Sequence, residues 1–205
     1  MAMGPFPYVV AVEGISETIK SLGEMPASVQ RFARMAVNST TKRARTLASK
    51  RMREQVAWSA SYLSEKEDRL SITKQATDGD LEAHIRGRFR PTSLARFATG
   101  ESRQGVRVRV KPGRSELLGR AFFMKLRAGK SIETKSNRGL AIRLKPGEQM
   151  TGKHKMIQVA GNLYLLYGPS VDQVFRTVAE DIAPEASDML EAEFLRLIDA
   201  METDR

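Results

Sequence analysis

The sequence predicts an α+β protein in which a long N-terminal amphipathic helix packs on a mainly antiparallel β-sheet, with further helices at the C-terminus. Three observations predict this fold class. A helical apolar pattern runs through residues 26–60, a strand-rich region occupies residues 80–168, and helical patterns return over residues 170–203. Because the strands are grouped and do not alternate with helices, an antiparallel sheet is expected. We expect residues 1–205 to form a single domain.

The first helix is predicted from an apolar stripe with three- and four-residue spacing. Pro26 stands where a helix commonly begins, since its missing N–H would have had no helical partner. Trp58, Tyr62 and Leu63 follow the pattern and are expected to anchor its end in the core. The members of the stripe are Val29, Phe32, Ala33, Ala36, Val37, Thr40, Ala44, Leu47, Ala48, Met52 and Val56.

The central region is predicted to consist of short strands. Alternating apolar and polar residues indicate strands at 81–86 and 106–110, and a turn is expected at 111–114. The proline-containing segment 88–94 is expected to be a loop, and the polar stretch near 128–138 a mobile loop. Three further strands are expected, at 121–126, 140–144 and 163–167.

The C-terminal helices are predicted from two breaking signals. The segment Gly168-Pro169-Ser170 is expected to end the last strand sharply and to start a helix at Val171, with Ser170 as its cap. Pro184 is expected to open or restart the final helix.

Positive and negative charges are separated along the chain, which has a net charge of +10. Residues 26–60 carry eight Lys or Arg against one acid, whereas residues 172–205 carry three against ten acids. Such polarity suits a protein that meets copies of itself or a charged neighbour. A basic surface also attracts nucleic acid, so a nonspecific DNA-binding protein is an alternative of a different class.

No catalytic, cofactor or metal site is predicted, and the chain is not expected to be an enzyme. It has no cysteine, which excludes disulfides and thiolate zinc sites. A phosphate-binding loop around Lys130 would need glycine where Met124 stands. His84 and His154 have no second ligand at the usual spacing and are predicted to be ordinary surface residues. No membrane segment or secretory signal is recognised, so synthesis in the cytoplasm is expected.

Several segments, from about Ile15 to Phe175 and in the same order, together resemble the minor tail protein Z family of bacteriophages and prophages. The arginine-rich helix around Asn38 is similar to the family's first helix. Asp172 is a departure, since it stands where proline is common in the family. The central matches include Arg90, Pro91, Leu94 and Phe97, then Gly119, Ala121 and Phe122. The most specific match is a turn with the residues Tyr167, Gly168, Pro169, Ser170, Val171 and Phe175.

The resemblance implies a structural virion protein that completes the head-proximal end of a long tail, so that the tail can join the head. Its expected partners are copies of itself in a sixfold ring, the tail terminator or tube protein, and head-side connector proteins. It would be made in the host cytoplasm and end in the virion. A closer alternative within this setting is a tail terminator or head-side connector.

Five basic residues of the first helix are the candidate contact residues. They are expected to face either an acidic C-terminal helix of an adjacent subunit or the genomic DNA. The segment 120–138 is expected to order only in the virion. Gly119 is expected to allow a close backbone turn before the apolar anchor Phe122. The five basic residues are Arg43, Arg45, Lys50, Arg51 and Arg53.

Overall fold

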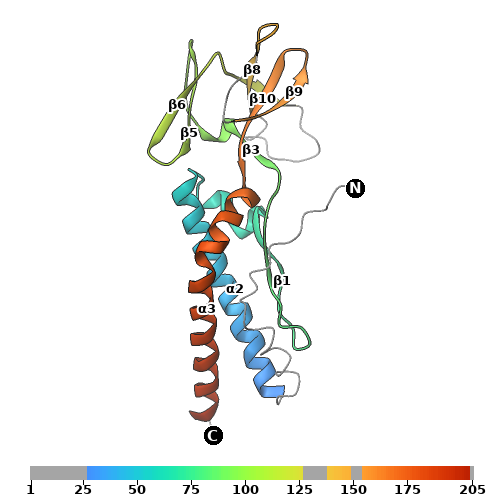
Figure 1. Ribbon diagram of the computed structural model, residues 1–205, viewed down its shortest axis with the longest axis vertical. Coiled ribbons are helices and arrows are strands. Elements are labelled where there is room, and N and C mark those ends of the chain that lie inside the picture. Colours follow the sequence, from blue (N-terminus) through green and yellow to red (C-terminus); the bar gives the residue numbers. More distant parts are fainter. Residues whose placement is uncertain (1–26, 127–137, 149–153, 204–205) are drawn as a thin grey trace. The chain divides into compact units, whose positions relative to one another are not determined.

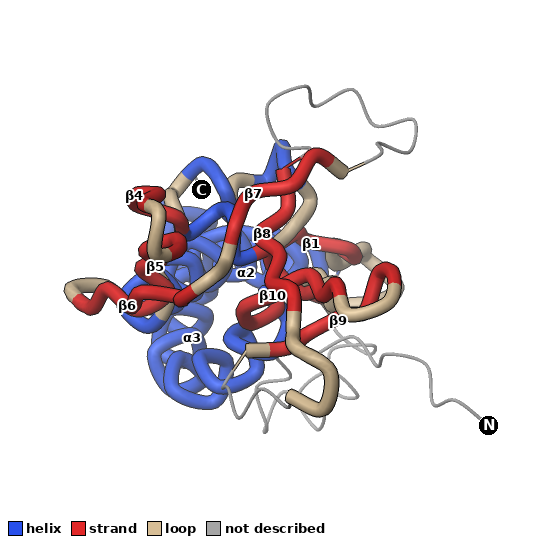
Figure 2. Tube along the Cα trace, turned by 90° about the horizontal axis from the view of Figure 1, so that it is seen from above, coloured by secondary structure: helices blue, strands red, loops and turns tan. Residues whose placement is uncertain are grey.

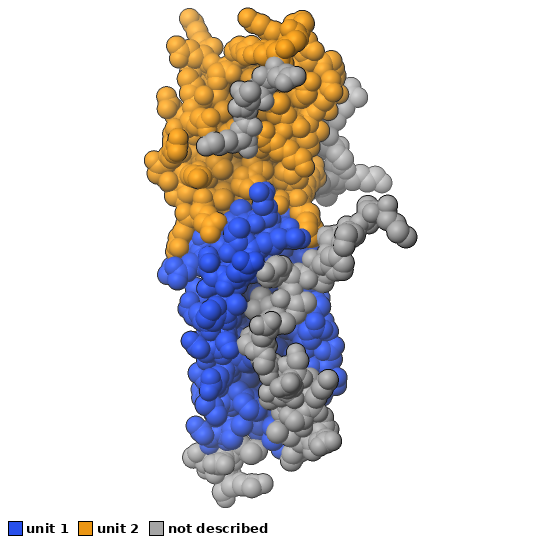
Figure 3. Space-filling model, viewed as in Figure 1, with its two compact units in different colours: residues 1–52, 60–88, 172–205 blue, residues 53–59, 89–171 orange. Residues whose placement is uncertain are grey.

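The computed structural model describes residues 27–126, 138–148 and 154–203 and has the α+β class that the sequence predicts. The chain divides into two compact units (Figure 3). Unit 1 comprises residues 1–52, 60–88 and 172–205, and unit 2 comprises residues 53–59 and 89–171. No helix among the described residues is long and apolar enough to cross a membrane. The loop expected near 128–138 lies outside the described residues, except for Arg138.

Unit 1 is built on two long helices, α2 (Ala27–Gln55) and α3 (Val171–Thr203). Figure 1 shows them side by side and running in opposite directions. An antiparallel hairpin of β1 (Leu70–Lys74) and β2 (His84–Gly87) completes the unit, with short 3₁₀ turns before it. The predicted helix over 26–60 is therefore confirmed, although it ends at Gln55.

The buried stripe of α2 consists mainly of small side chains. Ala36 and Ala48 are fully buried, whereas Phe32, Val37 and Leu47 of the predicted stripe are only partly buried. Small residues let neighbouring elements approach the helix closely, so a larger side chain has no room to be accommodated. The buried positions of α2 are Ala33, Ala36, Thr40, Ala44, Ala48 and Met52.

A second face of α2 carries polar side chains that hold the β1–β2 hairpin. The Asn38 side-chain amide donates to the Ala76 carbonyl at 3.0 Å, and its side-chain oxygen accepts from the Ala76 N–H at 2.9 Å. One turn earlier, Arg34 forms an ion pair with Asp78 at 3.2 Å. Because Arg34 and Asn38 are four residues apart, they lie on one face of the helix and bind consecutive parts of the hairpin.

Unit 2 is built from antiparallel strands in two sheets (Figure 2). In the larger sheet, β10 (Leu163–Ser170) pairs with β8 (Arg138–Arg143), β9 (Lys155–Ala160) and β3 (Pro91–Ser93), and β7 (Phe122–Lys125) pairs with β8. In the smaller sheet, β5 (Gly105–Lys111) lies between β4 (Ala98–Ser102) and β6 (Arg114–Gly119). A 3₁₀ helix, Leu94–Phe97, connects β3 to β4.

The expectation of one sheet covered by the first helix is wrong, because the described strands form three sheets. Within unit 1, α2 instead packs with α3 and the hairpin: Ala33 and Leu81 form a buried cluster with Val29 and Phe194. The sheets are antiparallel as predicted, and the strands expected at 106–110, 121–126 and 140–144 are present.

Three expectations about proline are corrected. The strand predicted to end at Tyr167 continues to Ser170, because β10 then pairs with β3 through a register shift that spans Pro169. The segment 88–94, expected as a loop, contains the strand β3, which begins at Pro91. Pro184 does not open a new helix but lies exposed inside α3, so a single C-terminal helix replaces the predicted helices.

We predict that Ala48→Leu lowers the free energy of unfolding by about 1–3 kcal/mol, because the added methyl groups enter a fully packed position. Urea denaturation of the purified protein measures this change. The control is Ala192→Leu on the exposed side of α3, which should change stability by less than about 0.5 kcal/mol. Equal stability of the two variants would contradict close packing along α2.

Candidate functional site

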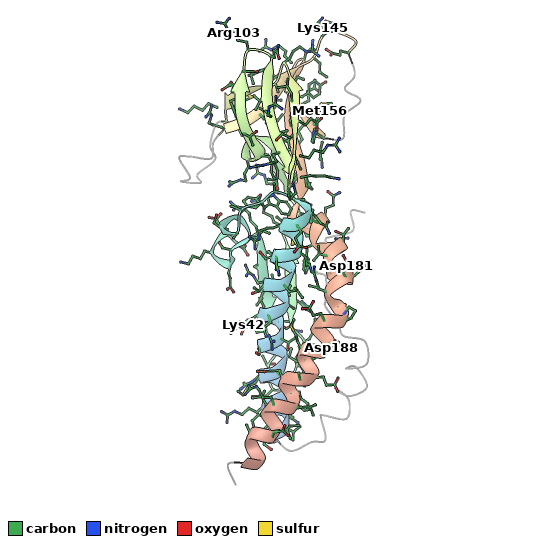
Figure 4. All side chains as sticks on the ribbon, turned by 90° about the vertical axis from the view of Figure 1, so that its left-hand side faces the viewer. Lys42, Arg103, Lys145, Met156, Asp181 and Asp188 are labelled. Carbon is green, nitrogen blue, oxygen red and sulfur yellow. The ribbon has the colours of Figure 1, made fainter. Side chains whose placement is uncertain are left out.

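The candidate site is a pair of oppositely charged helix surfaces in unit 1. Helix α2 carries eight Lys or Arg and one acid, whereas α3 carries two Arg and nine acids. Because one face of α2 is buried and another binds the hairpin, its remaining face is exposed and basic. Figure 4 shows Lys42 on α2 and Asp181 and Asp188 on α3.

The exposed cations of α2 form what we call the basic stripe. Lys42 and Lys50 are exposed and form no ion pair within the described part of the chain. Met35, at 41% exposure, is an apolar residue within this stripe. The stripe consists of Arg31, Lys42, Arg43, Lys50 and Arg51.

The exposed acids of α3 form the corresponding acidic stripe. Leu195, at 52% exposure, is the most exposed of the large apolar side chains among the described residues and follows these acids on the same helix. An exposed apolar residue surrounded by charges is typical of a contact surface, in which the apolar group supplies area and the charges supply orientation. The stripe consists of Glu180, Asp181, Glu185, Asp188 and Glu191.

Glu193 on α3 lies near Ser39 and Arg43 on α2, which shows the levels at which the two helices face each other. Glu193 pairs with Arg196 at 3.0 Å, and this partner is the main cause that lowers the pKa of the Glu193 carboxyl. The Ser39 hydroxyl and the Arg43 charge on α2 lower the same pKa further. Since the helices are antiparallel and residue 193 is level with residue 39, Leu195 lies at about the height of Met35, within roughly one helical turn.

The five basic residues predicted as contacts differ in their surroundings. Arg43, Lys50 and Arg51 are exposed, and Arg53 is partly buried. Arg45 has a structural role: its Nε donates to the Leu70 carbonyl at 2.8 Å, and its Nη2 donates to the Leu63 carbonyl at 2.8 Å. Because these bonds use its guanidinium to fix the start of β1, we leave Arg45 out of the basic stripe.

The residues that carry the family resemblance are partly brought together in unit 2. Pairing of β10 with β3 places Tyr167 opposite Ser93 and Ser170 opposite Pro91. A Cβ atom on Gly168 would lie 3.2 Å from Leu94 and 3.3 Å from Phe97. Glycine therefore lets these two buried side chains approach the strand. Gly168, Leu94 and Phe97 therefore form a packing cluster, while the matching Phe175 is fully buried on α3.

The close backbone approach expected at Gly119 occurs instead at its strand partner Gly105, and the unusual backbone conformation occurs at the next residue, Arg120. Gly105, which pairs with Gly119, has φ of +144°, and a Cβ there would lie 2.1 Å from the Leu118 carbonyl oxygen. Arg120 then takes a left-handed conformation with φ of 61°. Its guanidinium bonds Glu148 at 3.1 Å and, together with the Lys145 N–H, lowers the pKa of Glu148 to about 2.

The prediction that both histidines are ordinary surface residues is wrong. The His84 side chain is 17% exposed, and its Nε2 lies 2.7 Å from Glu82. The His154 side chain is 12% exposed, and its Nε2 lies 3.7 Å from Glu116. No three potential ligands among the described residues group as a metal site would require.

Comparisons of the chain with protein-family models, with curated proteins and with solved structures gave no significant match.

We predict that Arg45→Met lowers the free energy of unfolding by about 1.5–3 kcal/mol, because the Leu63 and Leu70 carbonyls lose a charged donor. Methionine keeps an unbranched stem like that of arginine and lacks the guanidinium, so the loss reports mainly on these bonds. Thermal or chemical denaturation measures it, with Lys42→Met on the exposed face as the control. A loss no larger than in the control would mean that Arg45 is a surface charge after all.

Proposed function

We propose that this chain is a structural virion protein that completes the head-proximal end of a long bacteriophage tail and forms part of the neck. The proposal rests on the ordered sequence resemblance to the minor tail protein Z family over residues 15–175. The structural observation that supports it is the pair of complementary stripes on α2 and α3. A protein with both surfaces in one unit is suited to repeated contact with copies of itself.

In the proposed assembly, the basic stripe of one subunit meets the acidic stripe of the next. Such a head-to-tail contact uses two different surfaces, so it generates a closed ring when the rotation between subunits closes. If the ring axis runs along the helices, Met35 of one subunit meets Leu195 of its neighbour at the same height. The tail tube imposes sixfold symmetry in this reading, and the chain catalyses no reaction.

The neighbours in the particle distinguish this role from a close alternative. A tail terminator or a head-side connector would use the same kind of ring but would act at another step of assembly. The complementary stripes favour a ring in each of these roles, and the step at which assembly stops without the chain distinguishes them.

Deleting the gene for this chain from a phage that carries it tests the role. We predict full heads beside full-length, unattached tails, because both precursors would form but fail to join. Electron microscopy of the lysate distinguishes the outcomes. Normal infectious particles would exclude the neck role, and the absence of tails would favour tube assembly or length termination.

A charge-reversal experiment tests the proposed contact. Variant A carries Lys42→Glu and Lys50→Glu, and variant B carries Asp181→Lys and Asp188→Lys. We predict that either variant alone lowers the yield of infectious particles at least about tenfold when it replaces the wild-type chain, because like charges then face each other.

Expressing variants A and B together should restore the yield, because each altered stripe then meets its complement in an alternating ring. Reversal of two exposed lysines outside the stripes, Lys66→Glu and Lys125→Glu, is the control and should leave the yield unchanged. Circular dichroism establishes that each variant is folded. Wild-type yields from A and B alone, or no recovery from the mixture, would rule out the contact.

A further inference from the structure

Most of the positive charge of the protein lies in unit 2 and not on the basic helix. Residues 53–59 and 89–171 hold 18 Lys and Arg against five Asp and Glu, a net charge of +13. The remaining residues, those of unit 1, hold 16 against 19, a net charge of −3. Unit 2 is therefore the part of the chain whose net charge attracts an anionic partner.

The smaller sheet of unit 2 has one buried side and one cationic side. Val106 and Val108 of β5 are buried, whereas the alternating residues Arg107 and Arg109 are exposed. Successive side chains of a strand point to opposite faces, so the two arginines share the outward face. We call this the arginine face.

Further basic side chains lie at both ends of β5. Arg103 lies in the β4–β5 turn, and Figure 4 shows it at the same end of unit 2 as Lys145. Lys111 pairs with Arg114 at the other end of β5.

The residues opposite Arg107 are Gly100 and Leu117, neither of which is charged. The two acids of this sheet pair with valines of the buried side: Glu101 with Val106, and Glu116 with Val108. Arg107 and Arg109 themselves form no ion pair with any described residue. The arginine face therefore has unneutralised guanidinium groups held on a paired strand.

We propose that the arginine face binds the phosphate backbone of double-stranded DNA without reading its sequence. Guanidinium groups match phosphate oxygens with two parallel hydrogen bonds, and strand positions keep them at fixed spacing. Leu117, opposite Arg107, is the large exposed apolar residue among the described residues of this sheet, and the net charge of +13 of unit 2 favours a strongly anionic partner. No aromatic side chain stands in β4, β5 or β6 to stack unpaired bases, which disfavours a single-stranded ligand.

The residues that the sequence predicts to face either an acidic neighbouring helix or DNA lie on the first helix. There the cations share unit 1 with the acids of α3, whose field opposes the approach of phosphate. The arginine face stands on charge and strand geometry alone and does not depend on the proposed role in the neck.

The test is fluorescence anisotropy of the full chain with labelled 25-base-pair duplexes of two unrelated sequences over a series of salt concentrations. The variant is Arg107→Gln with Arg109→Gln. The matched control is Arg31→Gln with Arg43→Gln, which removes two exposed arginines of α2. We expect equal affinity for both duplexes and a slope of log K against log salt that is smaller by about 1.8 in the variant, since each phosphate contact contributes about 0.9.

The control should keep the wild-type slope, and the variant should bind at least about tenfold more weakly at low salt. No binding of the wild-type chain at about 50 mM salt would overturn the proposal. An equal loss in the control would move the surface to α2. Tighter binding of a single strand of the same length, or of heparin, would show that duplex DNA is the wrong ligand.

Discussion

Helix α2 is held from two sides at once, and the arrangement of unit 1 depends on this constraint. Its small buried residues admit close neighbours, while Arg34, Asn38 and Arg45 bind the hairpin through side-chain groups. These two faces leave a third exposed, where lysine and arginine remain. The basic stripe is therefore the one exposed face of a helix whose other two faces contact the core and the hairpin. An exposed charge there costs little in folding, so it is available for contact with a partner.

The helices and the strands with regular alternation could be predicted from the sequence, because their patterns report local burial directly. In β5, buried valines alternate with exposed arginines, and the strand was recognised. By contrast, β6 and β9 are exposed along most of their length and therefore lack an alternating pattern. β3 begins at a proline, which argued for a loop. In β6 and β9, pairing with the adjacent strand of a hairpin decides the structure, and in β3 pairing with the distant strand β10 does so. The local pattern of apolar residues records neither kind of pairing.

The candidate site was predictable in its charges but not in their partners. Counting residues along the chain gives a basic first helix and an acidic last one. It does not reveal that Arg45 is engaged by two backbone carbonyls, because every residue carries a carbonyl and the sequence does not say which lie nearby. The same holds for His84, whose neighbour Glu82 stands two residues away and so gave no ligand spacing. The partners of Arg45 and His84 are set by the tertiary fold, so they could not be predicted from the composition.

The two units differ in the kind of partner that their charges permit. A surface of one sign repels its own copy, so the strongly positive unit 2 is a poor surface for self-association. Unit 1 has both signs on neighbouring helices and an exposed apolar residue on each, so a second copy offers it a complementary surface. The proposed ring contact accordingly uses the helices, and the proposed DNA contact uses the sheet. Because the two contacts use different residues, a substitution in either surface should leave the other intact.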